Sequence, residues 1–246
     1  WADTIRAAPA DTLSMTCSDP ALPTTTDNLC LQAACRLADA FGVTAGAALH
    51  LDKQVPYGAG LGSGSSDAAA TLQLLSELWG LDPPPHALHD IAASIGSDVP
   101  FFLQEAPAAY GTGRGDQLSP LTSGDAPFRL SLPVLVVVPK TRVSTPDAYA
   151  QVAPSAASRP FLPTLVSAED LPRWRTALTN DFEAPVAAAE PAVAAALRAL
   201  RTTDAGYVSL SGSGGATYAV YNTVAAAREA QAAVQSTARR VHLMLP

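Results

Sequence analysis

The sequence predicts an α+β protein with two lobes. Segments with helix and strand periodicity are mixed along the 246 residues, without the strict alternation of a parallel α/β sheet. Hydrophobic residues make up 48% of the chain and charged residues 15%, which is the composition of a globular protein with a sizeable core. A stretch rich in Gly, Pro, Ser and Asp at 104–131 marks a crossing between lobes. We therefore expect an N-terminal lobe at 1–125 and a C-terminal lobe at 126–246.

The N-terminal half predicts two strand regions and three helices. Residues 1–19 contain strand fragments, and Asp27 is placed to cap a helix of about 14 residues. The alternating run 46–56 is a strand, and a glycine-rich loop joins it to an amphipathic helix at 65–79. A turn of prolines then leads to a short helix that ends at Gly96, in the position after the last helical residue.

The C-terminal half predicts a second set of strands and helices. The apolar run "LPVLVVVP" at 132–139 is a buried strand, and the Pro- and Ser-rich residues 153–172 form a long surface loop. Residues 181–203 give two helices with a break at Pro191. The remaining elements, in chain order, are a strand, glycine turn and strand at 205–221, a helix at 223–238 and a strand at 239–246.

Charge and composition exclude several classes of protein. The formal net charge of −7 and the pI of about 4.9 argue against a nucleic-acid partner, which would need a clustered basic surface. The run at 132–139 is too short to span a bilayer, and the sequence opens without a signal-peptide pattern, so we expect a cytoplasmic protein with no membrane partner. Cys17, Cys30 and Cys35 lack metal-ligand spacing and are expected to be free, buried thiols in a reducing cytosol, so no metal site is predicted.

The stretch "PYGAGLGSGSSDAAA" at 56–70 raises the question of phosphate binding. Its glycines do not fit G-x-G-x-x-G, and it lacks the lysine of a P-loop. Glycines nevertheless let a backbone approach an anion closely, and the helix after the loop offers unpaired N–H groups. The alternative is a flexible turn in which Ser65, Ser66 or Asp67 is an ordinary helix cap.

Seven segments, in a fixed order over most of the chain, resemble those of the galactokinase, homoserine kinase, mevalonate kinase and phosphomevalonate kinase superfamily. "IGSDVPFFL" and "STPDAYA" are more specific than glycine spacing alone. The seven segments are "DNLCLQAA" (27–34), "LDKQVPYGAGLGSGSSDAA" (51–69), "IGSDVPFFL" (95–103), "GTGRGDQLSPL" (111–121), "PKTRVSTPDAYA" (139–150), "TNDFEAPV" (179–186) and "LSGSGGATYAVY" (210–221).

The resemblance implies a two-lobed small-molecule kinase. It implies a nucleotide-binding N-terminal lobe similar to the second domain of ribosomal protein S5, a ferredoxin-like substrate lobe and an ATP site between them. It further implies transfer of phosphate from ATP, with Mg²⁺, to the 2-hydroxyl of a cytidine diphosphate methylerythritol, by a monomer or weak homodimer. The runners-up are another small-molecule kinase of the superfamily and a nucleotide-binding sensor or inactive pseudo-kinase.

The same resemblance assigns roles to individual residues. Asp98 is the expected catalytic base, which orients the acceptor hydroxyl and takes its proton. Lys53 and Asn28 match positions near the adenosine end of the nucleotide. Thr145, Tyr149, Gly212 and Gly214 are the expected substrate-binding residues, with Tyr149 stacking on the cytosine. The residues expected to wrap the ATP phosphates are Pro56, Tyr57, Gly58, Ala59, Gly60, Leu61, Gly62, Ser63, Gly64, Ser65 and Ser66.

Each of these residues also has a purely structural interpretation. Asp98 could be a turn or capping aspartate before Pro100, and Lys53 a solvated strand lysine. Asn28 could be a polar residue at a helix N-terminus, and Tyr149 a half-buried core residue. Arg114 is as much a candidate for a loop ion pair as for a phosphate contact.

The sequence departs from the family pattern at its start. Members begin with a strand that carries an "AKxNL"-like lysine beside the catalytic aspartate, and a "DGYH"-like segment that helps to hold the cytosine comes next. Neither pattern is present, and "WADTIRAAPADTL" resembles the family segment located just after both of them. The family's usual spacing implies an upstream segment of about 30–40 residues, so we expect that the chain is a truncated or partly ordered product. The alternative is a protein that lacks part of its site.

Overall fold

The computed structural model describes residues 1–153 and 160–246, whose contacts form two compact units. Unit 1 comprises Trp1–Val55 and Gly62–Pro120, and unit 2 comprises Pro56–Leu61 and Leu121–Pro246. The chain therefore leaves unit 1 after Val55 and returns at Gly62, so the first part of the glycine-rich loop belongs to unit 2. The lobe boundaries predicted from the sequence stay a prediction.

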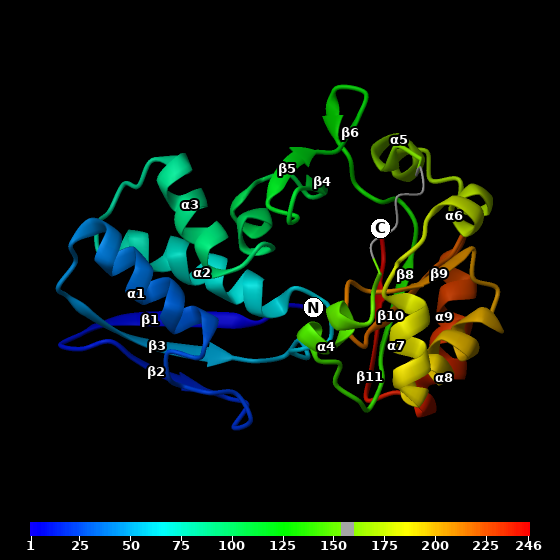
Figure 1. The fold of residues 1–246 in the computed structure, drawn as a ribbon, viewed down its shortest axis with the longest axis horizontal. Coiled ribbons are helices and arrows are strands. Elements are labelled where there is room, and N and C mark those ends of the chain that lie inside the picture. Colours follow the sequence, from blue (N-terminus) through cyan, green and yellow to red (C-terminus); the bar gives the residue numbers. More distant parts are fainter. Residues whose placement is uncertain (154–159) are drawn as a thin grey trace. The chain divides into compact units, whose positions relative to one another are not determined.

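Unit 1 is a three-stranded sheet with helices on one face (Figure 1). The strand order is β1-β3-β2, in which β3 pairs antiparallel with β1 and parallel with β2. Leu49 and Leu51 of β3 pack against Leu37, Leu72 and Leu75 of the helices, and all five side chains are buried. The elements are β1 (Thr4–Ala10), β2 (Ser14–Cys17), α1 (Leu29–Phe41), β3 (Gly46–Asp52), α2 (Ser63–Leu78), α3 (Pro85–Ile95), η1 (Val99–Leu103), β4 (Ala109–Thr112) and β5 (Gln117–Pro120).

The structure corrects one local expectation for unit 1, confirms a second and shifts a third by two residues. The cap of α1 is Asn28 rather than Asp27, because the Asn28 side chain accepts the hydrogen bond from the Cys30 N–H at 3.0 Å. The short helix α3 ends at Ile95 and Gly96 follows it, as predicted, with an extended backbone of φ −175°. The helix predicted at 65–79 begins two residues earlier, at Ser63.

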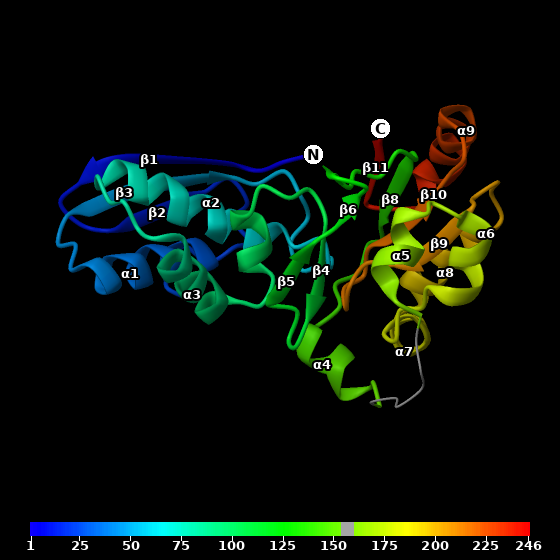
Figure 2. The same cartoon turned by 90° about the horizontal axis from the view of Figure 1, so that it is seen from above.

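Unit 2 has the ferredoxin-like arrangement that the sequence predicts. Its antiparallel sheet has the order β11-β8-β10-β9, and the chain order β8, α8, β9, β10, α9, β11 is a split βαβ pattern (Figure 2). Leu135 and Val137 of β8 pack against α8 and α9. The α+β fold class is thereby confirmed. The elements of the split pattern are β8 (Val134–Val138), α8 (Pro191–Arg201), β9 (Tyr207–Leu210), β10 (Thr217–Val220), α9 (Val224–Val234) and β11 (Arg240–Met244).

The connections in unit 2 contain more regular structure than the sequence suggests. The stretch 104–131, read as a plain crossing, holds hairpin β4–β5 in unit 1 and hairpin β6–β7 in unit 2. The predicted surface loop at 153–172 is partly helical, and its residues 154–159 lie outside the described part of the chain. The helix break at Pro191 is confirmed. The remaining elements are β6 (Thr122–Ser123), β7 (Ala126–Pro127), α4 (Thr145–Ala150), α5 (Leu162–Ser167), α6 (Leu171–Ala177), α7 (Glu183–Ala189) and η2 (Gln235–Thr237).

Two further sequence expectations concern the membrane and the cysteines. Within 1–153 and 160–246, no helix combines the length and the hydropathy that crossing a bilayer requires. Cys17, Cys30 and Cys35 are free thiols, as predicted, but Cys30 alone among them is buried, whereas all three were expected to be.

Candidate active site

The glycine-rich loop has a left-handed backbone at alternate positions. Gly58, Gly60 and Gly62 have φ values of 67°, 80° and 68°, which residues with a Cβ rarely adopt. Alternation of left-handed and ordinary residues is the kind of backbone in which successive N–H groups converge on an anion. The loop is therefore a built conformation rather than an unspecific flexible turn.

Helix α2 begins directly after this loop, and a glycine rather than a serine occupies its cap position. Gly62 is the capping residue and makes no side-chain hydrogen bond to the first turn, which contains no acidic residue. The interpretation of Ser65, Ser66 or Asp67 as the cap is therefore wrong. The N-terminal end of a helix carries a partial positive charge and N–H donors, so the start of α2 is suited to bind an anion.

A second glycine turn, between β9 and β10, interlocks with the loop inside unit 2. The Ser211 hydroxyl donates to the Gly60 carbonyl at 2.7 Å, and the Ala216 N–H donates to the Ala59 carbonyl at 2.8 Å. A Cβ on Gly60 would lie 2.9 Å from the Gly214 nitrogen, and a Cβ on Gly214 would lie 2.5 Å from the Ala59 carbonyl oxygen. Both positions therefore need glycine, because a Cβ at either one would collide with backbone atoms of the other turn.

Asn180 holds the same turn from its other side, and the sequence interpretation gave it no role. Its amide nitrogen donates to the Leu210 carbonyl at 2.9 Å and to the Gly212 carbonyl at 2.8 Å, while its oxygen accepts from the Phe182 N–H at 2.9 Å. Gly212 has φ of 56°, so the turn needs glycine there as well. The available signal was the motif "TNDFEAPV", which contains Asn180 but does not say what the residue contacts.

The loop also packs on the sheet of unit 2. Ala59 joins a buried cluster with Val136 and Val138 of β8, on the face opposite α8 and α9. The Arg142 guanidinium lies over the Tyr57 ring at 4.3 Å from its centre, which is a cation–π contact. Sequence reasoning placed Tyr57 at the site but missed Arg142, whose position could not be inferred without the fold.

Asp98 lies between α3 and η1 and is exposed. The next two residues, Val99 and Pro100, are buried and anchor the short helix in unit 1. Asp98 occupies the turn and cap position before η1, as its structural interpretation expects, but its side chain makes no capping hydrogen bond to that helix. Its place before two anchored residues gives the carboxylate a fixed backbone, as a positioned base requires.

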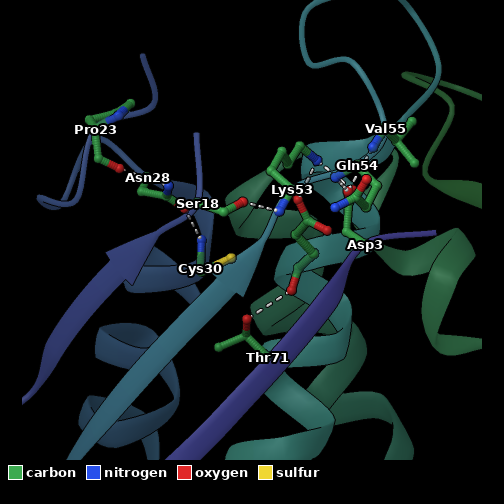
Figure 3. Close-up of polar contacts among 10 residues, drawn as sticks. Asp3, Ser18, Pro23, Asn28, Cys30, Lys53, Gln54, Val55 and Thr71 are labelled. Atoms are coloured by element: carbon green, nitrogen blue, oxygen red, sulfur yellow. Dashed lines mark hydrogen bonds and ion pairs between the residues drawn. The ribbon is translucent and has the colours of Figure 1, made fainter. Parts of the chain in front are cut away.

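Asn28 is committed to the structure of unit 1 (Figure 3). Besides capping α1, its amide nitrogen donates to the Pro23 carbonyl at 2.9 Å, and the residue is buried. The structural interpretation of Asn28 as a polar residue at a helix start is therefore confirmed. Its contact with the adenosine end of a nucleotide stays a prediction.

Lys53 is a buried ion-pair residue and not a solvated strand lysine. Its side chain is 2% exposed, and its ammonium lies 2.5 Å from an Asp3 oxygen and 2.7 Å from an Asp67 oxygen. The second Asp3 oxygen accepts from the backbone N–H groups of Gln54 at 2.6 Å and Val55 at 2.8 Å (Figure 3). Neither Asp3 nor Asp67 was singled out from the sequence as a partner of Lys53, because the contact spans separate segments.

The two carboxylates of this cluster have pKa values shifted in opposite directions. Burial raises the pKa of Asp67 to about 6, against the lowering effect of the Lys53 ammonium. The pKa of Asp3 is lowered: burial would raise it, but the Lys53 ammonium and the N–H groups of Val55 and Gln54 together outweigh that effect. At any given pH, Asp3 is therefore more fully ionised than Asp67.

Thr145 and Tyr149 lie on α4 in unit 2. Ser144 caps this helix, Thr145 is its exposed first residue, and Ala148 is the buried contact to the core. Tyr149 is 62% exposed, and its ring meets the Phe182 ring edge-on at 4.8 Å between centres. The interpretation of Tyr149 as a core residue is wrong, and its exposed face is free of the core packing that would prevent stacking on a base.

A cavity of about 540 Å³ lies in unit 2 beside the interlocked turn. Its lining includes Asn180, Phe182, Ser211 and Gly212. The structure thus brings together, within unit 2, the loop residues 56–61 and the predicted Gly212 and Gly214. Thr145 and Tyr149 lie in unit 2 as well. The remaining predicted residues lie in unit 1, namely Asn28, Lys53, Gly62, Ser63, Gly64, Ser65, Ser66 and Asp98. Arg114 forms an exposed ion pair with Asp116 at 2.9 Å.

The fold and these two glycine motifs define a class of protein. Residues 28–106 match the N-terminal domain of the GHMP kinases, and residues 162–240 match the C-terminal domain of the same family. The chain belongs to the GHMP kinase family. It is accordingly an enzyme that uses ATP as a kinase does and acts on a small molecule.

Within that family, two curated relatives carry the same, more specific name. The 4-diphosphocytidyl-2-C-methyl-D-erythritol kinase of Salinibacter ruber (strain DSM 13855 / M31) is 61% identical over 244 residues, which cover 99% of this chain and 86% of that protein. The protein of the same name from Chlorobium limicola (strain DSM 245 / NBRC 103803 / 6330) is 39% identical over 226 residues, with 90% and 77% covered. The resemblance drawn from the motifs is thereby confirmed.

Solved structures give the same fold. A crystal structure of 4-(cytidine 5'-diphospho)-2C-methyl-D-erythritol kinase matches with a TM-score of 0.75 and 28% identity, over 98% of this chain and 84% of that one. The homoserine kinase of Cytophaga hutchinsonii matches with a TM-score of 0.72 over 98% of this chain and 85% of that one, and at 18% identity it supports the fold alone.

Proposed function

We propose that this protein transfers the γ-phosphoryl group of ATP to the 2-hydroxyl of 4-diphosphocytidyl-2-C-methyl-D-erythritol, a step in non-mevalonate synthesis of isoprenoid precursors. The observation that carries the proposal is the 61% identity over 99% of the chain to a curated kinase of that name. The interlocked glycine turns and the start of α2, where the cap Gly62 has no side chain, supply the matching chemistry for a polyphosphate.

In this proposal the ATP phosphates lie along the glycine-rich loop, residues 56–66. The positive-φ glycines leave the backbone without side chains that would block a close approach of phosphate. Phosphoryl transfer depends chiefly on positioning and charge stabilisation, so a rigid backbone cradle suits it. The contacts of Ala59 and Gly60 with the second glycine turn supply that rigidity.

Mg²⁺ is the second cofactor of the proposal, and it would neutralise charge on the phosphates when bound. The hydroxyls of Ser63, Ser65 and Ser66 are the hard oxygen donors at the start of α2 that fit this ion. Among the described residues no group of three His, Cys, Asp or Glu side chains could hold a metal. Hydroxyl donors suit Mg²⁺, which commonly keeps several waters and binds through substrate phosphates.

Asp98 is proposed to orient the acceptor hydroxyl and to receive its proton as the new bond to phosphorus forms. Its carboxylate is exposed, and the buried Val99 and Pro100 fix the backbone beside it. Thr145 and Tyr149 are proposed to bind the acceptor, with the Tyr149 ring stacked on the cytosine. The exposed Tyr149 ring, braced edge-on by Phe182, is suited to such a stack.

Location and assembly are proposed more briefly. The free thiols Cys17, Cys30 and Cys35 suit a reducing cytoplasm, and the net charge of −7 suits a protein without a nucleic-acid partner. We propose a monomer or a weak homodimer, which sedimentation at two protein concentrations would distinguish.

The proposed activity is tested by ADP release from the full-length protein with three acceptors in parallel. The cytidine substrate should give turnover, whereas mevalonate and homoserine should give almost none. Turnover on mevalonate or homoserine instead would assign the protein to another branch of the family. ATP binding without turnover on any of the three would indicate a nucleotide sensor.

A further inference from the structure

The Asp3–Lys53–Asp67 cluster occupies a particular point on the chain path. Lys53 and the next two residues are the last of unit 1 before the loop leaves it, and Asp67 lies in α2 just after the loop returns. Asp3 precedes β1, and its carboxylate binds both the Lys53 ammonium and the backbone of Gln54 and Val55. One ammonium therefore connects the two points at which the glycine-rich loop is attached to unit 1.

The contacts argue against direct binding of a nucleotide by Lys53. The ammonium is held at 2.5 and 2.7 Å by carboxylates whose side chains are 5% and 6% exposed. Moving it to a phosphate or a base would leave both carboxylates buried without their counter-ion, which is strongly unfavourable. Lys53 also donates its backbone N–H to the Ser18 hydroxyl at 2.8 Å, so its main chain is fixed as well.

Charge makes the same cluster important for an anionic ligand. Two carboxylates close to the start of α2 would oppose the favourable field of the helix N-terminus. The single ammonium offsets one of the two charges, and because burial raises the pKa of Asp67 to about 6, the second charge is lost as the pH falls through that value. The groups that face Asp67 are Lys53, Asp3 and the thiol of Cys30, whose pKa is raised to about 11 by burial and which is therefore neutral near pH 7.

We propose that Lys53 is a positioning residue, which together with Asp3 and Asp67 fixes the two ends of the glycine-rich loop on unit 1. The Lys53 ammonium also offsets negative charge beside the loop. Lys53 thereby sets the affinity for ATP without touching the nucleotide. This inference rests on the proposed function, since it takes the loop as the ATP site. It differs from the role near adenosine that the family resemblance implies for Lys53.

The test uses Lys53→Met, Asp67→Asn and their combination in the full-length protein. ATP affinity is measured by equilibrium binding, and kcat by ADP release at saturating ATP. Lys53→Met should weaken ATP binding by about tenfold or more, the order expected when a buried charge loses its partner, with a smaller effect on kcat. Adding Asp67→Asn should restore much of the affinity, because it removes one uncompensated carboxylate. Asp52→Asn is the matched control, since the Asp52 carboxylate accepts a hydrogen bond from the Gln54 side chain and lies outside the cluster.

Three results would overturn the proposal. The first is an unchanged ATP affinity in Lys53→Met, which would make the cluster a stabilising element only. The second is a lost affinity that Asp67→Asn does not improve, which would indicate direct nucleotide contact. The third is an unchanged pH dependence of ATP affinity in the single variant Asp67→Asn.

This single variant keeps an oxygen for the Lys53 ammonium, so it stays informative if Lys53→Met fails to fold. ATP affinity should change less between about pH 5 and pH 8 in Asp67→Asn than in the wild type.

Because ATP binding is measured independently of turnover, this test is separate from the test of the proposed function. A wild-type protein that binds ATP but does not phosphorylate the cytidine substrate would contradict the proposed function alone. The comparison of Lys53→Met with the double variant would then still decide the role of the cluster.

Discussion

The substitution Gly214→Ala attacks the contact between the two glycine turns. A Cβ on Gly214 would lie 2.5 Å from the Ala59 carbonyl oxygen and closer still to the Gly60 nitrogen. These neighbours are backbone atoms that cannot rotate away, and Gly214 does not have a positive φ, so the whole cost comes from this collision. Relief requires the loop and the turn to separate by roughly 1 Å, because ordinary carbon contacts need about 3.5 Å.

The size of the effect follows from that separation. A displacement of about 1 Å in a positioning element can cost about 100-fold in rate, so kcat/KM for ATP should fall by about that factor. Forcing a methyl into a packed contact costs about 1–3 kcal/mol of unfolding free energy, so the Tm should fall by several degrees. The loss of activity should therefore be larger than the loss of stability suggests.

The neighbouring Gly215→Ala is the matched control. Its Cβ would lie 3.3 Å from a methyl group of Val143, which can yield by a few tenths of an ångström, and it meets nothing of the loop. We expect steady-state ADP release with varied ATP to be nearly normal in Gly215→Ala and strongly impaired in Gly214→Ala. Near-normal ATP kinetics in Gly214→Ala would refute the reasoning, as would equal damage in the two variants.

Three further predictions concern the proposed base, the acceptor site and the buried carboxyl. Asp98→Ala should lower kcat by about 10²–10⁴-fold and leave ATP affinity unchanged, and near-normal turnover would remove Asp98 from the mechanism. Tyr149→Ala should raise the KM for the cytidine substrate by about tenfold with little change in Tm, and a fall in Tm alone would contradict the stacking role. Asp67 has a folded-state pKa raised to about 6, so its contribution to stability is present below about pH 4 and lost as the pH rises through 6. Asp67→Asn should therefore raise the Tm at pH 8 more than at pH 5, and an equal difference at both would contradict the shift.

Local patterns were sufficient for most of the regular structure. The apolar run at 132–139 and the glycine turn at 205–221 predicted strands that the structure contains, because both are local signals. Helix starts were less predictable: Asp27 and Asn28 are both good caps, and in the structure Asn28 both caps α1 and donates to the Pro23 carbonyl.

The site was predictable as a set of motifs but not as a set of contacts. The glycines of 56–66 and of 210–216 were recognised separately, and the fold brings Gly60 and Gly214 into direct contact. The burial of Lys53 could not be foreseen, because its partners lie just before β1 and within α2, and the packing of these segments depends on the whole of unit 1. Family motifs carry such pairings only implicitly.

The central claim is phosphoryl transfer to one particular hydroxyl, and ³¹P NMR of the reaction product tests it most directly. The full-length protein, incubated with ATP, Mg²⁺ and 4-diphosphocytidyl-2-C-methyl-D-erythritol, should produce ADP together with one new phosphomonoester signal coupled to carbon 2 of the methylerythritol unit. A phosphomonoester at another position would contradict the account, as would ADP formation without any new phosphorus signal on the cytidine compound.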